Sequence, residues 1–166
     1  MATMDDLKAA FAGESQANRK YLAFAKKAEA EGFPQIAKLF RAAGEAETVH
    51  AHSHLRVMKG VGKTDENLQA AIDGEGYEFQ KMYPEFIKQA EKEGNKAAVL
   101  SFKGAMAAEE IHHRMYSEAL ASFKAGQDLP KAVYFVCQVC GHTVAGSAPD
   151  QCPVCKALKE KFVEVK

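Results

Sequence analysis

The sequence predicts an all-α four-helix bundle that is followed by a small, β-rich C-terminal domain. Apolar residues recur at helical spacing up to about Lys124, and the composition changes after Gly126. Ala, Glu, Lys and Leu dominate the first part, as is typical of helices, whereas Pro, Gly, Val and aromatic residues in the second part favour strands and turns. We therefore expect two domains, residues 1–126 and 131–166.

Turn signals divide the first domain into four helices. Gly32-Phe33-Pro34 separates the first helix from the second. A longer crossover at residues 63–67 leads into a third helix that ends at Gly94, and a fourth helix covers residues 96–124. Two short turns and one long connection are typical of the ferritin-like variant of the bundle. We also expect Pro84 to kink or break the third helix.

The helical part contains an internal repeat with an offset of 62 residues. The matched pairs are Tyr21/Tyr83, Phe24/Phe86, Glu29/Glu91, Glu31/Glu93, Gly32/Gly94, Phe40/Phe102, Glu47/Glu109 and His50/His112. With one residue of slack, Gly13-Glu14 falls on Gly74-Glu75. Matches of Ala and Glu are expected by chance in helices, but paired Tyr, Gly, Phe and His are not. We expect two helical hairpins related by a pseudo-two-fold axis.

The repeat selects residues that together can hold metal ions. Each half offers one glutamate on its first helix, Glu14 or Glu75, and a Glu-x-x-His on its second helix. These Glu-x-x-His motifs are Glu47/His50 and Glu109/His112. Residues three apart share a helix face, so each motif can offer an oxygen and a nitrogen to one point. Carboxylate-bridged di-iron bundles use this set of ligands.

An alternative interpretation places these acids on the solvated surface, the usual location of Glu. Glu14 argues against it, because it lies on the same apolar stripe as Phe11, Tyr21 and Phe24. Burying unpaired carboxylates costs several kcal/mol each, so cations must share the interior. Carboxylates with a few imidazoles suit iron or manganese better than zinc or copper.

A further glutamate and two matched tyrosines near these motifs can each be interpreted in two ways. Glu78 lies three residues after Glu75 and is either a further ligand or an exposed acid beside Lys81. As a ligand it would break the pseudo-symmetry, because the first half has no acid there. Tyr21 and Tyr83 are either hydrogen-bond donors to the carboxylates or ordinary core residues.

The register of the fourth helix is ambiguous. Glu110 and His113 form a second Glu-x-x-His one residue after the first. The repeat favours Glu109 and His112, because they match the motif of the second helix.

All four cysteines lie in the second domain as two Cys-x-x-Cys pairs, Cys137/Cys140 and Cys152/Cys155. Four thiolates at this spacing can surround one tetrahedral metal ion. Spacing alone does not identify the metal, and a structural zinc site is the alternative to iron.

Composition gives no indication of a nucleic-acid or membrane partner. The 22 acidic residues balance the 22 basic residues, and no apolar run approaches the ~20 residues of a membrane span. Because no signal-peptide pattern follows Met1, we expect a soluble, cytoplasmic protein.

Together these features closely resemble rubrerythrin over essentially the whole chain. The motifs that carry the resemblance are Ala12-Gly13-Glu14-Ser15-Gln16 with Tyr21, Glu47-x-x-His50, Gly74-Glu75-x-x-Glu78 with Met82-Tyr83-Pro84, Glu109-x-x-His112 and the two cysteine pairs. The resemblance implies a non-haem peroxidase that reduces hydrogen peroxide to water in oxidative stress defence. It also implies a rubredoxin-like domain that carries iron and transports electrons.

The resemblance further implies roles for individual residues. The di-iron ligands would be Glu14, Glu47, His50, Glu75, Glu78, Glu109 and His112, and a third iron, or a substituting zinc, would bind Cys137, Cys140, Cys152 and Cys155. In the family one iron moves between the positions of His50 and Glu78 with redox state. Gly76, inside the Glu-x-x-Glu motif, departs from family members that have a bulkier residue there.

The resemblance also implies partners: hydrogen peroxide, a rubredoxin- or NAD(P)H-dependent reductase, and a second copy of the chain. From His112 to the end of the fourth helix is roughly twelve residues, or about 18 Å. We therefore expect the cysteine domain to lie far from its own di-iron ligands and to dock on another chain. Family members form head-to-tail dimers, some with swapped helices. Two rival functions are iron storage by a ferroxidase and a non-enzymatic sensor with zinc at the cysteines.

Overall fold

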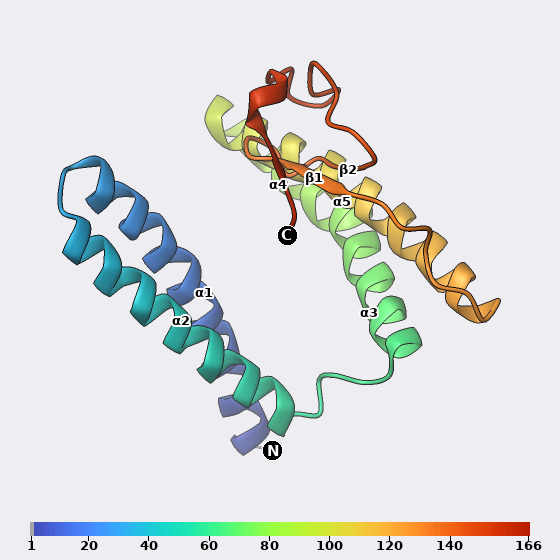
Figure 1. Cartoon of the computed structure of the whole chain (residues 1–166), viewed down its shortest axis with the longest axis horizontal. Helices are drawn as coiled ribbons and strands as arrows, with labels where there is room; N and C mark the ends of the chain where they lie inside the picture. The colour runs from blue at the N-terminus through green and yellow to red at the C-terminus, as the bar shows by residue number, and fades with distance from the viewer. Residues whose placement is uncertain (1) are drawn as a thin grey trace. The chain divides into compact units, whose positions relative to one another are not determined.

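The computed structural model describes residues 2–166, which form two compact units (Figure 1). One unit ends at Gly62 and the other comprises Lys63–Lys166. Helices account for most of the chain, and a small antiparallel sheet lies near its C-terminal end, as predicted. Within residues 2–166, no helix has both the length and the apolar character of a membrane span. The predicted division at residues 126–131 lies inside the second unit and stays a prediction.

The first unit is a hairpin of α1 (Ala2–Ala30) and α2 (Pro34–Val57). Gly32 allows the chain to turn because its φ of +83° lies in the left-handed region. Pro34 opens α2, where its missing N–H removes no helical hydrogen bond. The buried positions of the two helices are Asn18, Ala25, Ala28, Ala37, Gly44 and Ala51. Because most of these residues are small, the two helices can approach each other closely.

The predicted third helix, in the second unit, changes from α- to π-geometry shortly before Pro84 and then continues as an α-helix through it. The helices of this unit are α3 (Thr64–Tyr77), one turn of π-helix (Glu78–Met82), α4 (Tyr83–Lys92) and α5 (Lys96–Lys124). The Tyr83 N–H donates to the Glu78 carbonyl, five residues earlier. This wider turn directly precedes Pro84, which has no N–H to continue a regular α-helix. Such π-helical turns frequently occur at functional sites.

The internal repeat is visible in the packing of the two hairpins. Each packs one tyrosine against two phenylalanines, and the two triads are Tyr21/Phe24/Phe40 and Tyr83/Phe86/Phe102. In both triads the ring centroids of tyrosine and the phenylalanines lie 6.3 and 6.2 Å apart, and those of the phenylalanines 5.6 Å apart. The predicted pair of similar hairpins is therefore confirmed, and the axis relating them stays a prediction.

A three-stranded antiparallel sheet lies at the end of the second unit, and the two cysteine pairs lie at the end of its first strand and in the adjoining turns. The strands of the sheet are β1 (Tyr134–Cys137), β2 (Thr143–Ala145) and β3 (Phe162–Glu164), in the order β2-β1-β3. A short 3-10 helix (Lys159–Lys161) leads into β3. The core of this part contains Cys137, Ala148, Cys152 and Phe162. Residues 134–164 are hereafter called the knuckle region.

After α5 the chain turns back along the helix (Figure 1). Gly126 begins this reversal, with a φ of +74°. A Cβ placed on Gly104 of α5 would lie 3.3 Å from the Cβ of Cys140, and one placed on Gly141 would lie 3.6 Å from the Cβ of Ala108. The knuckle region therefore packs against α5 of its own chain. The prediction that it lies far from its own helical ligands is wrong, because the linker at residues 125–133 runs back along the helix.

Candidate functional site

The first hairpin brings together three of the predicted ligands. Glu14 of α1 meets Glu47 and His50 of α2, and one ligand atom from each lies within 4.8 Å of the others. His50 Nδ1 is 2.9 Å from Glu47 Oε2, because residues three apart share one face of α2. We call these three residues the first half-site.

The second unit builds the same arrangement from the matching residues. Glu75 of α3 meets Glu109 and His112 of α5, and again the ligand atoms lie within 4.8 Å of one another. His112 Nδ1 is 2.7 Å from Glu109 Oε2 and 3.8 Å from Glu75 Oε1. These three residues form the second half-site. Two oxygens and one nitrogen at this spacing are donors that suit a hard or borderline divalent metal ion.

The structure separates the two possible registers of α5. Glu109 is half-buried and belongs to the second half-site, whereas Glu110 is exposed. The ring of His113 packs against Phe79 with centroids 5.4 Å apart. The motif that the repeat selects is therefore the one that lies with Glu75.

Negative charge is crowded in the second half-site. Burial, a hydrogen bond with Glu109 and repulsion from Glu109 and Glu78 raise the pKa of Glu75 to about 7. Burial and the charge of Glu109 also raise the pKa of Glu78. Ionising all of these carboxylates together is unfavourable without a cation between them. The donor set therefore fits a metal ion, whose positive charge would relieve the crowding.

Glu78 and Tyr83 lie at the two ends of the π-helical turn. Glu78 is its first residue and is partly buried, so the predicted exposed-acid interpretation does not describe it. The group of ligand atoms within 4.8 Å contains Glu75, Glu109 and His112 but not Glu78, among the residues that the structure describes. Burial and the carboxylates of Glu78, Glu109 and Glu75, in that order, raise the pKa of Tyr83, which places its hydroxyl near these acids.

The four cysteines of the knuckle region form a separate cluster. Cys137 Sγ lies 3.6 Å from Cys155 Sγ, and Cys140 Sγ lies 3.6 Å from Cys152 Sγ. A tetrahedral ion with metal–sulfur distances of about 2.3 Å would hold its sulfurs about 3.8 Å apart. Because the observed spacings are close to that value, the cluster fits one tetrahedral metal ion.

The thiols of this cluster differ in how readily they ionise. Burial raises the pKa of Cys140 and that of Cys155. At Cys152 burial also opposes ionisation, but hydrogen bonds from the backbone N–H groups of Cys155 and Val154 outweigh it and lower the pKa to about 7. The backbone of this knuckle is thus arranged to stabilise a thiolate, the form that binds metal.

Sequence reasoning missed two features around the second half-site. Thr143 of β2 contacts His112, with 2.8 Å between Thr143 Oγ1 and His112 Nε2. A Cβ on Gly76 would lie 3.2 Å from Cδ2 of His113, so this glycine makes room for the His113 ring. The repeat could not reveal Thr143, because the knuckle region has no counterpart in the first hairpin. The sequence showed a glycine at position 76, but not that the ring of His113 lies beside it.

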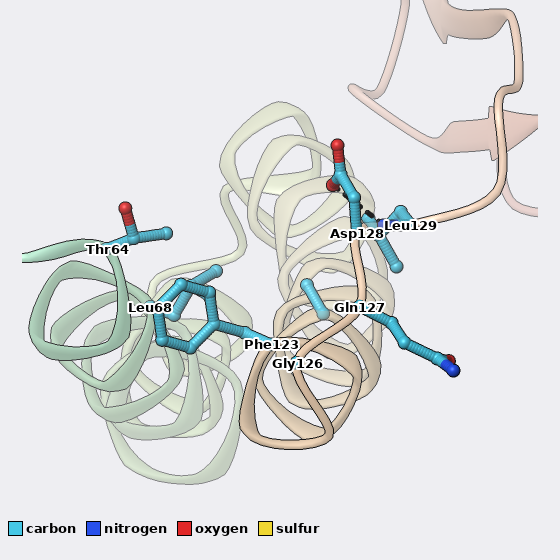
Figure 2. A pocket seen from close by; sticks show the side chains of 8 residues that line it. Thr64, Leu68, Phe123, Gly126, Gln127, Asp128 and Leu129 are labelled. Atoms are coloured by element: carbon cyan, nitrogen blue, oxygen red, sulfur yellow. Dashed lines mark hydrogen bonds between the residues drawn. The ribbon is translucent and has the colours of Figure 1, made fainter.

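A cavity of about 630 Å³ elsewhere in the second unit does not share this chemistry. Figure 2 shows that it is lined by the start of α3, the end of α5 and the residues that follow. Asp128 is the one titratable residue of its lining, and its carboxylate accepts a hydrogen bond from the Leu129 N–H. The candidate chemistry therefore lies at the half-sites and the cysteine cluster.

Comparison with known proteins agrees with this arrangement. Residues 5–120 match the family model for rubrerythrin, and residues 135–163 match the model for the rubredoxin-like domain of rubrerythrin. Rubrerythrin-2 of Clostridium acetobutylicum is 35% identical over 174 residues, covering 96% of this chain and 95% of that protein. Nigerythrin of Nitratidesulfovibrio vulgaris is 37% identical over 175 residues, covering 97% and 85%.

Solved structures of nigerythrin show the same fold, a ferritin-like bundle with a rubredoxin-like domain. The partially reduced form has a TM-score of 0.58 and 34% identity, covering 98% of this chain and 86% of that one. The fully reduced, all-ferrous form gives the same values. Glutamate and histidine residues for a di-iron site and four cysteines for a rubredoxin-like site are thus present in this chain. The resemblance found in the sequence is confirmed, and the chain belongs to the rubrerythrin family.

Proposed function

We propose that this protein is a non-haem di-iron peroxidase that reduces hydrogen peroxide to water in oxidative stress defence. Its family comprises oxidoreductases, and within that class we assign peroxide as the oxidant. The observation that supports this most is the contact between the knuckle region and His112. It joins a one-metal thiolate cluster, suited to carrying single electrons, to a candidate ligand of the reactive metal pair. Iron storage would leave this contact without a role.

We assign the iron pair to seven residues and the third iron to the four cysteines. The proposed ligands of the pair are Glu14, Glu47, His50, Glu75, Glu78, Glu109 and His112, and those of the third iron are Cys137, Cys140, Cys152 and Cys155. The repeated geometry of the half-sites supports the first set. The crowded charge around Glu75 supports it independently, because two cations would stabilise the carboxylates in their ionised form.

An iron pair held by the seven residues would supply the two electrons needed to reduce peroxide, and an iron held by the four cysteines would supply replacement electrons one at a time. Converting peroxide into two water molecules also consumes two protons. We assign one of them to Glu78 in the state in which it does not bind iron, because burial and the charge of Glu109 raise the pKa of its carboxyl group. The Tyr83 hydroxyl, whose pKa burial and the carboxylates of Glu78, Glu109 and Glu75 raise, carries its proton at neutral pH and is the other donor that we propose. Tyr21, its counterpart in the repeat, would serve the first half-site.

The electrons must come from outside the chain. We propose a rubredoxin- or NAD(P)H-dependent reductase that delivers them to the knuckle region. The four cysteines cluster as a candidate metal site and form no disulfides, and cysteine clusters of this kind are typical of a reducing compartment such as the cytoplasm, where we place the protein.

We also propose that the protein is a homodimer. The two helices of the first unit do not by themselves cover the apolar side chains of Leu22 and Phe24. A second chain that covered this surface would stabilise the hairpin by removing it from water. Head-to-tail docking and exchange of helices stay predictions, and sedimentation equilibrium tests the oligomeric state. A monomeric mass with full activity would contradict the dimer.

Stopped-flow mixing tests the peroxidase assignment. Fully reduced, iron-loaded protein is mixed anaerobically with hydrogen peroxide, and separately with dissolved dioxygen, while ferric absorption is recorded. We expect oxidation by peroxide to be much faster than oxidation by dioxygen. Equal rates, or faster oxidation by dioxygen, would reject the peroxidase function and favour a ferroxidase.

A further inference from the structure

Thr143 lies where the knuckle region meets the second half-site. It is the first residue of β2, and its hydroxyl makes two hydrogen bonds. Thr143 Oγ1 is 2.8 Å from His112 Nε2 on α5 and 3.1 Å from the carbonyl oxygen of Gly141. The side chain thus links the Cys140-Gly141 turn to the ring of His112.

The directions of these hydrogen bonds follow from counting protons. A carbonyl oxygen only accepts, so the single hydroxyl proton of Thr143 is donated to Gly141. The hydroxyl oxygen can then accept a hydrogen bond from the Nε2–H of His112. In the neutral tautomer that this bond favours, the proton lies on Nε2 and Nδ1 carries the lone pair.

That lone pair faces two carboxylates. Nδ1 of His112 is 2.7 Å from Glu109 Oε2 and 3.8 Å from Glu75 Oε1. A lone pair and an ionised carboxylate repel each other at such a distance, unless a proton or a metal ion lies between them. A hydroxyl that favours the proton on Nε2 thus leaves Nδ1 ready to bind a cation that the carboxylates also bind.

The first half-site differs at the corresponding place. The ring of His112 contacts Thr143 of β2, whereas residues 2–62 form no strand that could contact the ring of His50. Each ring approaches the glutamate three residues before it, so the difference lies in the surroundings and not in the ligand geometry.

We propose that Thr143 is a positioning residue for His112, which selects Nδ1 as the metal-binding nitrogen and fixes the angle of the ring. This inference rests on the proposed di-iron function, because it concerns a ligand of the same site. Hydrogen-bond partners behind a metal-binding histidine hold its tautomer and orientation, and losing one typically weakens metal binding by about 10- to 100-fold.

Two substitutions separate the hydroxyl from the rest of the side chain. Thr143→Val keeps the branched shape and removes the hydrogen bonds, whereas Thr143→Ser keeps the hydroxyl and removes the methyl group. Ferrous ion is titrated anaerobically into full-length protein that already carries iron at the cysteines. The absorption of that thiolate site, after oxidation, reports that the knuckle region is intact.

We expect Thr143→Val to weaken binding of one of the two helical iron ions by about 10- to 100-fold, and Thr143→Ser to restore most of it. The second readout is the nitrogen-15 spectrum of the His112 ring in zinc-loaded protein. The Nε2–H signal should persist in wild type and Thr143→Ser, and exchange rapidly with water in Thr143→Val.

The result that would overturn the inference is unchanged iron affinity and an unchanged ring spectrum in Thr143→Val. Equal weakening by both variants would also overturn it, because packing of the methyl group would then explain the effect. Neither readout uses peroxide. A protein that showed no preference for peroxide would therefore not contradict the role of Thr143. A Thr143→Val variant without any effect would likewise not contradict the peroxidase assignment.

Discussion

The two hairpins of this protein share their ligand geometry and differ in what surrounds it. Each has a Glu from one helix and a Glu-x-x-His from the next, with the histidine Nδ1 within 2.9 Å of its glutamate. The second hairpin adds Glu78, a π-helical turn and the knuckle region against α5. The repeated sequence thus provides the same ligands twice in different surroundings. The two copies therefore serve as controls for each other.

The largest effect should come from the shared ligands. We expect Glu47→Ala and Glu109→Ala to lower peroxidase activity by about 1,000-fold each, because losing the metal pair removes several kcal/mol of transition-state stabilisation. Glu110→Ala is the matched control, since Glu110 is exposed on the same helix. Steady-state peroxide reduction and iron analysis measure the effect. Full activity in either ligand variant would contradict the claim that both half-sites are needed for peroxide reduction.

A smaller and unequal effect should come from the matched tyrosines. Burial and three nearby carboxylates raise the pKa of the Tyr83 hydroxyl, so Tyr83→Phe should slow peroxide reduction by about 100-fold, as expected when a proton donor is lost. Tyr21→Phe, the same change in the other copy, should have a much smaller effect. Single-turnover rates at several pH values check this. Equal effects would show that the two tyrosines have the same role.

The crowded charge of the second half-site should appear in the stability of iron-free protein. The pKa of Glu75 is raised to about 7 from an ordinary 4.5, so the folded state holds this proton more tightly than the unfolded state. Its contribution to stability is complete below about pH 4.5 and is lost as the pH rises through about 7. Glu75→Gln should remove this loss and stabilise iron-free protein at pH 8 by about 1 to 2 kcal/mol, allowing for solvent screening.

The measurement is thermal unfolding of the iron-free wild type, Glu75→Gln and Glu14→Gln at pH 5 and pH 8, which compares how their stability depends on pH. Glu14→Gln is the matched variant in the hairpin that lacks a counterpart of Glu78. The prediction would be wrong if the wild-type protein became more stable from pH 5 to pH 8 and Glu75→Gln abolished that gain. Glu75 would then stabilise the folded protein in its ionised form.

The smallest effect concerns the glycines that flank Glu75. A Cβ on Gly74 would meet nothing within 4 Å, so Gly74→Ala should stabilise α3 by up to about 1 kcal/mol through helix propensity. A Cβ on Gly76 would lie 3.2 Å from His113, whose ring packs on Phe79. Gly76→Ala should therefore gain less or destabilise the protein. Urea unfolding of both variants tests this prediction. An equal increase in the free energy of unfolding would show that the His113 ring can move aside without cost.

The sequence predicted the parts of this protein that depend on local patterns. Helical periodicity and the offset repeat identified the hairpins, the matched turns at Gly32 and Gly94, and the residues that form each half-site. Pro84 indicated an irregularity in the third helix, although the pattern did not reveal that a π-helical turn precedes the proline.

The contacts of the knuckle region with α5 and the packing around Gly76 were not predicted. Helix length alone suggested that the cysteine pairs lie far from His112, but the linker runs back along α5 and brings Thr143 to the ring. A 31-residue separation between these two leaves no periodic trace in the sequence. The room that Gly76 leaves for His113 is likewise a matter of packing between two helices.

The most direct test of the account is the number and kind of iron ions in fully loaded, full-length protein. Elemental analysis with Mössbauer spectroscopy should find three iron ions per chain, one in a four-thiolate environment and two coupled ions with oxygen and nitrogen ligands. A single, thiolate-bound iron per chain would contradict the claim that the repeated Glu and Glu-x-x-His residues hold an iron pair.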